Sequence, residues 1–166
     1  MSVEEIVEAA GICSDAAERI VAARELHYAL GRYRVLSIGG IQDVVAALPR
    51  GFGHLETEVL LGFALTARNT LIGTVVLASG GSSGLSVRPK DIFVPLVRLG
   101  ASAFVLAHNH PSGAVDPSED DIRITNTVAD LGEKLGIPLL DHLIVGANDV
   151  LSFVEIGIMP ASSGAS

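Results

Sequence analysis

The pattern of hydrophobic and polar positions changes character near residue 58. Before it, apolar residues recur three and four positions apart in short runs that end at glycine or proline, which predicts helices over 3–10, 14–30 and 41–48. After it, apolar runs of strand length alternate with amphipathic runs of helical length. The predicted strands are 59–65, 71–78, 101–107, 142–145 and 151–154, and the predicted helices are 89–99 and 122–135. We therefore expect an α/β fold behind a short helical extension.

Residues 101–107 are a continuous run of mostly small apolar side chains, bounded by Gly100 and by a polar loop. A run of this kind is typical of a strand that is covered on both faces. The amphipathic stretch 122–135 ends at Gly136, with Pro138 beyond it, as a helix does. We divide the chain into a helical extension (1–37), a catalytic domain (38–160) and a flexible tail (161–166).

Composition argues against several classes of protein. Lys and Arg total 11 and Asp and Glu total 19, so the formal net charge is −8, which argues against a nucleic-acid partner held by its phosphates. No apolar stretch approaches the roughly 20 residues that a bilayer span needs, and the N-terminus is acidic, unlike a signal peptide. A single cysteine, Cys13, offers no intrachain disulfide. We expect a cytoplasmic protein without membrane contact, and the 49% apolar content is compatible with a homodimer.

The chemistry is concentrated in residues 108–121. His108 and His110 lie two apart where a buried strand ends, so both imidazoles can reach one point. Asp116-Pro117-Ser118-Glu119 predicts a helix start with Asp116 as N-cap and Pro117 as the first helical residue. Ser118 and Asp121 then share a face of the first turn.

Two histidines and one aspartate form the ligand set of a catalytic zinc site, in which a fourth position stays open for water. Bound water becomes a nucleophile at neutral pH, and a carboxylate outside the ligand set is needed to move its proton. The candidates for this general acid/base are Glu56 and Glu58, both near the head of the first strand. Ser118 has two interpretations of equal weight: a helix-start residue, or a donor to the oxyanion of an attacked carbonyl.

The spacing His-x-His-x7-Ser-x2-Asp (His108, His110, Ser118, Asp121) resembles the JAMM motif of the JAB/MPN metallopeptidases. The string HNHPSG at 108–113, the PS at 117–118 and the DHLI at 141–144 are similar to the bacterial RadC-like branch. The likeness runs from about 38 to 157 and implies a cytidine-deaminase-like α/β sandwich with zinc-dependent hydrolysis of peptide or isopeptide bonds. It implies His108, His110 and Asp121 as zinc ligands, Glu58 as the general acid/base in preference to Glu56, and Ser118 as the oxyanion donor.

Many RadC-like proteins carry a helix-hairpin-helix ahead of the catalytic domain, and residues 11–26 resemble one. Cys13 stands where the second glycine of the hairpin is expected, and its Cβ obstructs close approach to a phosphate. We interpret the segment as a decayed packing element.

Other interpretations stay open. The chain could be a non-enzymatic nucleic-acid or protein-interaction module associated with DNA repair, or a metal site that is silent until a partner orders it. Asp141 and His142 are either purely structural or groups that orient a ligand imidazole. The literal His-Asn-His string does not favour an endonuclease, because a buried strand precedes it, and the cysteine motif of nucleoside deaminases is absent.

Overall fold

The computed structural model describes residues 36–80 and 87–160 in full and, before them, positions 4, 7, 13–16, 18, 19 and 21. The chain divides into two compact units, residues 1–35 and 36–166. In the first unit the described positions 14–16, 18, 19 and 21 are helical. Most of residues 1–35, the segment 81–86 and the tail 161–166 lie outside the described residues, so the predicted helices 3–10 and 14–30, the resemblance of 11–26 to a helix-hairpin-helix and the flexible tail stay predictions.

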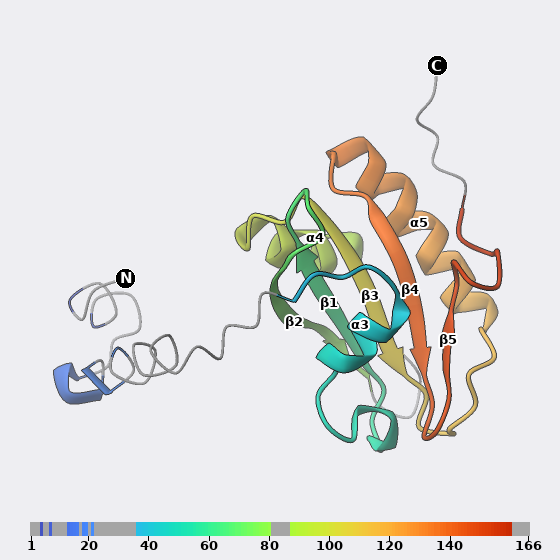
Figure 1. The fold of residues 1–166 in the computed structure, drawn as a ribbon, viewed down its shortest axis with the longest axis horizontal. Helices are drawn as coiled ribbons and strands as arrows, with labels where there is room; N and C mark the ends of the chain where they lie inside the picture. The colour runs from blue at the N-terminus through green and yellow to red at the C-terminus, as the bar shows by residue number, and fades with distance from the viewer. Residues whose placement is uncertain are drawn as a thin grey trace. The chain divides into compact units, whose positions relative to one another are not determined.

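The second unit is built on a five-stranded sheet in the order β2-β1-β3-β4-β5 (Figure 1). Its β3 and β4 run parallel, and every other neighbouring pair is antiparallel. The strands are β1 (Val59–Leu65), β2 (Leu71–Ser79), β3 (Ala103–Asn109), β4 (Leu139–Val145) and β5 (Val150–Ser152). All five predicted strands are present, and the predicted α/β class is confirmed.

Helices cover both faces of this sheet. On one face α3 (Ile41–Ala47) and the short 3-10 helix η1 (Phe52–His54) close an apolar core, and on the other α4 (Pro89–Arg98) and α5 (Glu119–Leu135) close a second one. Figure 1 shows α3 in front of the sheet and the two longer helices behind it. Among the described residues, no helix has the length and hydrophobicity to span a membrane.

The central strand β3 joins the two cores, because all seven of its residues are buried. Ala103, Val105 and Ala107 face the core under α3, whereas Phe104 and Leu106 face the core under α4 and α5. Side chains alternate between faces along a strand, so the next two residues are also divided. His108 lies on the α5 side and Asn109 on the α3 side.

The predicted start of α5 is wrong in one respect. Its N-cap is Ser118, not Asp116, and Pro117 precedes the helix. The helix begins after Ser118 because Ser118 and Asp121 form a reciprocal capping box. Ser118 Oγ accepts from the Asp121 N–H at 3.1 Å, and Asp121 Oδ2 accepts from the Ser118 N–H at 2.8 Å. The helix ends as predicted at Gly136, which adopts a left-handed conformation (φ 70°).

Candidate metal centre

Two imidazoles meet where β3 ends. His108 is the sixth of the strand's seven residues, and His110 follows the strand directly. Their Nε2 atoms lie 2.9 Å apart, so the two rings face one point, as the two-residue spacing predicts. His108 is fully buried, whereas the side chain of His110 keeps 17% of its surface exposed.

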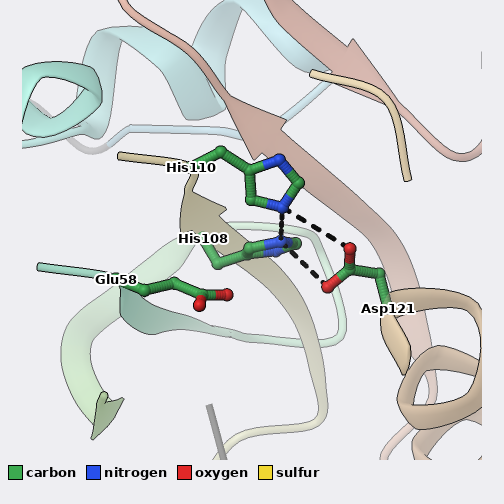
Figure 2. Close-up of side chains that lie close together, drawn as sticks. All are labelled: Glu58, His108, His110 and Asp121. Carbon is green, nitrogen blue, oxygen red and sulfur yellow. Dashed lines mark hydrogen bonds and ion pairs between the residues drawn. The ribbon is translucent and has the colours of Figure 1, made fainter. Parts of the chain in front are cut away.

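Asp121 brings a carboxylate to the same point from the first turn of α5. Its Oδ1 lies 3.1 Å from His108 Nε2 and its Oδ2 lies 3.5 Å from His110 Nε2 (Figure 2). Burial raises the pKa of the Asp121 carboxyl, but the hydrogen bond and charge of His108 and the hydrogen bonds from Ser118 outweigh burial and hold the pKa below its usual range. The lowered pKa favours the ionised form of the carboxylate.

Glu58 approaches the site from the other side, from the residue just before β1 (Figure 2). One ligand atom from each of Glu58, His108, His110 and Asp121 lies within 4.8 Å of the others. Within the described part of the chain, the Glu58 carboxylate has no hydrogen-bond or ion-pair partner of its own. Glu56, the other candidate, is exposed and does not belong to this group.

Asn109, between the two histidines, fastens the Glu58 segment to β3 from the opposite face. Its Oδ1 accepts from the Val59 N–H at 2.8 Å, and its Nδ2 donates to the carbonyls of Leu55 and Thr57 at 3.2 and 3.1 Å. The buried side chain thus uses an amide's donor and acceptor together, which a carboxylate could not do. The end of β3 therefore positions both imidazoles on one face of the sheet. On the other face it holds, through Asn109, the segment that contains Glu58.

His110 takes its orientation from the loop that follows it. Its Nδ1 donates to the carbonyl of Ala114 at 3.0 Å, which leaves a lone pair on Nε2 in the neutral ring. The loop packs against Gly146, where a Cβ would come within 2.4 Å of the Gly113 carbonyl oxygen. The open side of the site is thus held by backbone groups.

Behind His108 lies a second buried histidine, His142 of β4. His108 Nδ1 and His142 Nε2 are 2.9 Å apart, and His142 Nδ1 is 2.6 Å from the hydroxyl of Thr125. Complete burial, followed by the neighbouring His108, lowers the pKa of His142 well below its usual range, so the ring is neutral. The sequence left His142 between a structural and an orienting role, and the contact with His108 favours the latter.

The spacing of the donor atoms is compatible with a small metal ion between them. Bonds of about 2.0–2.1 Å to a tetrahedral ion place neighbouring donor atoms about 3.3 Å apart, and the three distances here are 2.9, 3.1 and 3.5 Å. Two imidazole nitrogens and an ionised carboxylate repel one another at this range unless a cation or a proton lies between them. The group can therefore bind a metal ion.

Ser118 sits at the edge of this group and is already engaged. Its hydroxyl donates to Asp121 Oδ2 at 2.6 Å while its Oγ accepts from the Asp121 N–H. In this geometry Ser118 caps α5 and orients a carboxylate, and its second interpretation as an oxyanion donor requires the hydroxyl to turn.

Sequence reasoning missed Asn109 and Thr125. Thr125 follows Asp121 by four residues, one helical turn, and this spacing was the available indication that both face the site. Nothing local in the sequence indicates that Asn109 contacts residues about fifty positions earlier.

Comparison with known proteins gives a consistent result. A family model described as the RadC-like JAB domain matches residues 38–158. A UPF0758 protein of Carboxydothermus hydrogenoformans is 38% identical over 152 residues, covering 90% of this chain and 67% of the relative. One from Clostridium perfringens is 34% identical over 160 residues (95% and 70%), and one from Burkholderia cenocepacia 37% over 126 residues (76% and 48%). The chain thus spans from about half to about two thirds of these relatives.

Proposed function

The chain belongs to the RadC-like JAB domain family, and from that premise we propose that its four-residue site is a zinc centre that hydrolyses amide bonds, peptide or isopeptide, in a peptide or protein substrate. The observation that carries the proposal is the convergence of two imidazole nitrogens and the Asp121 carboxylate beside a second carboxylate without a partner among the described residues.

His108, His110 and Asp121 would hold the ion, and three protein ligands leave one position of a tetrahedron open. When bound, zinc supplies a nucleophilic water near neutral pH and a Lewis acid for the substrate carbonyl. The remaining work is done by side chains of this chain. His108 and Asp121 are buried, so bulk water does not reach the metal position from their side.

Glu58 is the general acid/base of the proposal. Glu58 is half-buried, and its carboxylate points toward His108 (Figure 2). No described residue forms a hydrogen bond or ion pair with this carboxylate, so it can accept a proton without first breaking such a bond. It would take a proton from the attacking water and deliver it to the leaving amine, a role worth roughly 10²–10⁴-fold in rate. Asn109 keeps its backbone in place.

Ser118 is the oxyanion donor of the proposal. Turning its hydroxyl from Asp121 Oδ2 toward the substrate leaves that oxygen with the hydrogen bond from the Ser118 N–H at 2.8 Å. The carboxylate therefore keeps a partner while the hydroxyl moves, and a single donor of this kind is worth about 3 kcal/mol in a well-studied protease.

Metal content tests the ligand assignment. Protein depleted of metal, loaded with zinc and freed of excess should contain one zinc per chain by inductively coupled plasma analysis, and His108→Ala should contain less than a tenth of that. His54→Ala, which removes an exposed imidazole outside the group, is the matched control and should bind as the wild type does. An unchanged zinc content in His108→Ala would defeat the assignment.

The Glu58 role needs a separate test, since zinc binding alone is not hydrolysis. The zinc-loaded protein would be incubated with a library of synthetic peptides and isopeptides, and cleavage read by mass spectrometry. Glu58→Gln should retain zinc and lose at least a hundredfold in cleavage rate, whereas Glu56→Gln should cleave normally. Equal rates in both variants would remove Glu58 from the mechanism, and cleavage of no member by the wild type would count against the hydrolase.

A further inference from the structure

The hydrogen bonds behind His108 form a chain whose proton positions can be counted. Thr125 Oγ1 lies 2.6 Å from the backbone carbonyl oxygen of Asp121 and 2.6 Å from His142 Nδ1. A threonine hydroxyl has one proton, and a carbonyl oxygen only accepts. The Thr125 proton is therefore used on the Asp121 carbonyl, and Thr125 Oγ1 must accept from His142 Nδ1–H.

This assignment propagates to the ligand. A neutral His142 with its proton on Nδ1 has a lone pair on Nε2. That nitrogen is 2.9 Å from His108 Nδ1, so His108 Nδ1–H is the donor. In the neutral His108 ring, Nε2 is then the nitrogen with the lone pair, and it is the nitrogen that faces His110 and Asp121.

We propose that Thr125 and His142 are positioning residues that fix the tautomer of His108 and so keep its Nε2 lone pair directed at the metal position. The inference rests on the proposed function for the assignment of His108 as a ligand and for the identity of the ion, whereas the tautomer itself can be tested without a metal. Neither residue touches the metal or the substrate in this assignment.

The hydrogen-bond relay is continuous and buried, which distinguishes it from an incidental polar cluster. It begins at the backbone carbonyl of Asp121, passes through Thr125 and His142, and ends at His108, whose Nε2 lies 3.1 Å from the Asp121 carboxylate. Thr125, His142 and His108 are each 1% exposed, so water does not substitute for a missing member. Among the described residues no buried side-chain polar atom lacks a partner.

The opposite arrangement shows why the hydroxyl matters. If His142 carried its proton on Nε2, it would donate to His108 Nδ1, and His108 would have to carry its own proton on Nε2, where it would block the metal. The Thr125 hydroxyl oxygen stabilises the proton on His142 Nδ1, so removing the hydroxyl also removes the preference against the opposite arrangement. Partners of this kind behind a metal ligand are worth roughly 10–100-fold in metal affinity.

Imidazole nitrogen NMR tests the inference without metal or substrate. In ¹⁵N-labelled, metal-free protein at pH 8, long-range ¹H–¹⁵N correlations should show His142 protonated on Nδ1 and unprotonated on Nε2. Thr125→Val should lose this single state, and Thr125→Ser, which keeps a hydroxyl, should retain it. A wild-type His142 protonated on Nε2 would overturn the proposal.

Zinc affinity, measured by competition with a chromogenic chelator, gives the second readout. Thr125→Val should bind zinc 10–100-fold more weakly than the wild type, with Thr125→Ser close to the wild type. Thr127→Val is the matched control, because Thr127 makes the same bond to a carbonyl four residues back (2.9 Å to Arg123) on the exposed face of α5. Equal affinities for Thr125→Val and Thr127→Val would overturn the proposal.

The two proposals fail differently. If the wild-type protein binds no zinc but shows His142 in the Nδ1–H form, the proposed function is overturned and the hydrogen-bond relay stands. If it binds zinc normally but His142 carries its proton on Nε2, the relay is overturned and the zinc site stands. Circular dichroism of each variant confirms that the comparison is made between folded proteins.

Discussion

The two sides of the candidate metal centre are built in different ways. On the buried side, His108 is held by His142 and Thr125, three side chains that belong to β3, β4 and α5 and are each 1% exposed. On the open side, His110 is held by the carbonyl of Ala114 in a loop. Glu58 on this side is held by backbone hydrogen bonds: its own carbonyl accepts from the Gly80 N–H at 2.9 Å, and Asn109 bonds to the backbone of Val59 and Thr57.

Because of this difference, substitutions on the two sides should affect folding stability and side-chain position to different degrees. Strands and a helix fix the buried side, so a substitution there should lower the free energy of unfolding and displace His108 together. Loops that contact each other at Gly113 and Gly146 fix the open side, so a substitution there should displace His110 with a smaller loss of unfolding free energy. The predictions below compare the two sides, in order of decreasing effect on the free energy of unfolding.

Phe153→Ala tests the buried side most severely. Phe153 is 0% exposed and its ring packs against His142, with ring centroids 5.0 Å apart. Truncation should lower the unfolding free energy by about 3–5 kcal/mol, as measured by urea denaturation of metal-free protein, and should weaken zinc binding of the folded fraction. Phe93→Ala in the α4 core is matched in chemistry, but the Phe93 ring packs against Phe104, and the variant should lose stability alone. Equal losses of zinc affinity would contradict the idea that His142 needs local support.

Asn109→Asp tests the junction between the sides. The substitution preserves shape but turns a donor toward two carbonyl oxygens into a charged acceptor in a buried place. We expect a loss of about 3 kcal/mol in the unfolding free energy. The exposed Asn126→Asp on α5 is the control and should stay within about 0.5 kcal/mol of the wild type. If both variants unfold at the same denaturant concentration, the Asn109 amide does not fasten the Glu58 segment.

Gly146→Ala tests the open side. The added methyl group would lie 2.4 Å from the Gly113 carbonyl oxygen and 2.9 Å from Val115, so the loop that orients His110 must shift. The expected cost is about 1–3 kcal/mol in the unfolding free energy, with weaker zinc binding by competition titration. Gly73→Ala, whose added methyl group meets only ordinary van der Waals contacts with Leu99, is the control and should change neither quantity. Unaltered zinc affinity in Gly146→Ala would mean that the loop does not set the position of His110.

Ser118→Ala should have the smallest effect on folding. It removes the side-chain half of the capping box at the start of α5, which is worth about 1 kcal/mol. Thermal unfolding followed by circular dichroism measures this loss, and Ser102→Ala at an exposed position is the control. No difference between the variants would show that the Asp121 carboxylate alone sustains the helix start.

Apolar runs of strand length, bounded by polar or glycine-containing turns, made most of the sheet predictable. The boundaries 59–65 match β1, and the α5 terminus at Gly136 follows from helical spacing and a glycine. The start of α5 was misplaced because Asp116 and Ser118 both satisfy the N-cap preference, and the choice depends on where the Asp121 side chain lies. Local sequence does not contain that information.

The residues that support the site were harder to find, for a physical reason. His108, His110 and Asp121 are close in sequence, so strand and helix periods suffice to bring them together. Thr125 reaches His142 across 17 residues, and Asn109 reaches Val59 across 50. Contacts of this range follow from the strand order β1-β3-β4, which a hydrophobic pattern does not specify.

The division of residues 108–110 between the two faces of the sheet also restricts how the gene can change. Inserting or deleting a single codon within β3 would send both imidazoles to the α3 core and the amide among the helices. A two-codon change preserves the faces but displaces the ligands by about 7 Å along the strand, far from Asp121. Length variation in this domain should therefore be confined to the connections between its strands and helices.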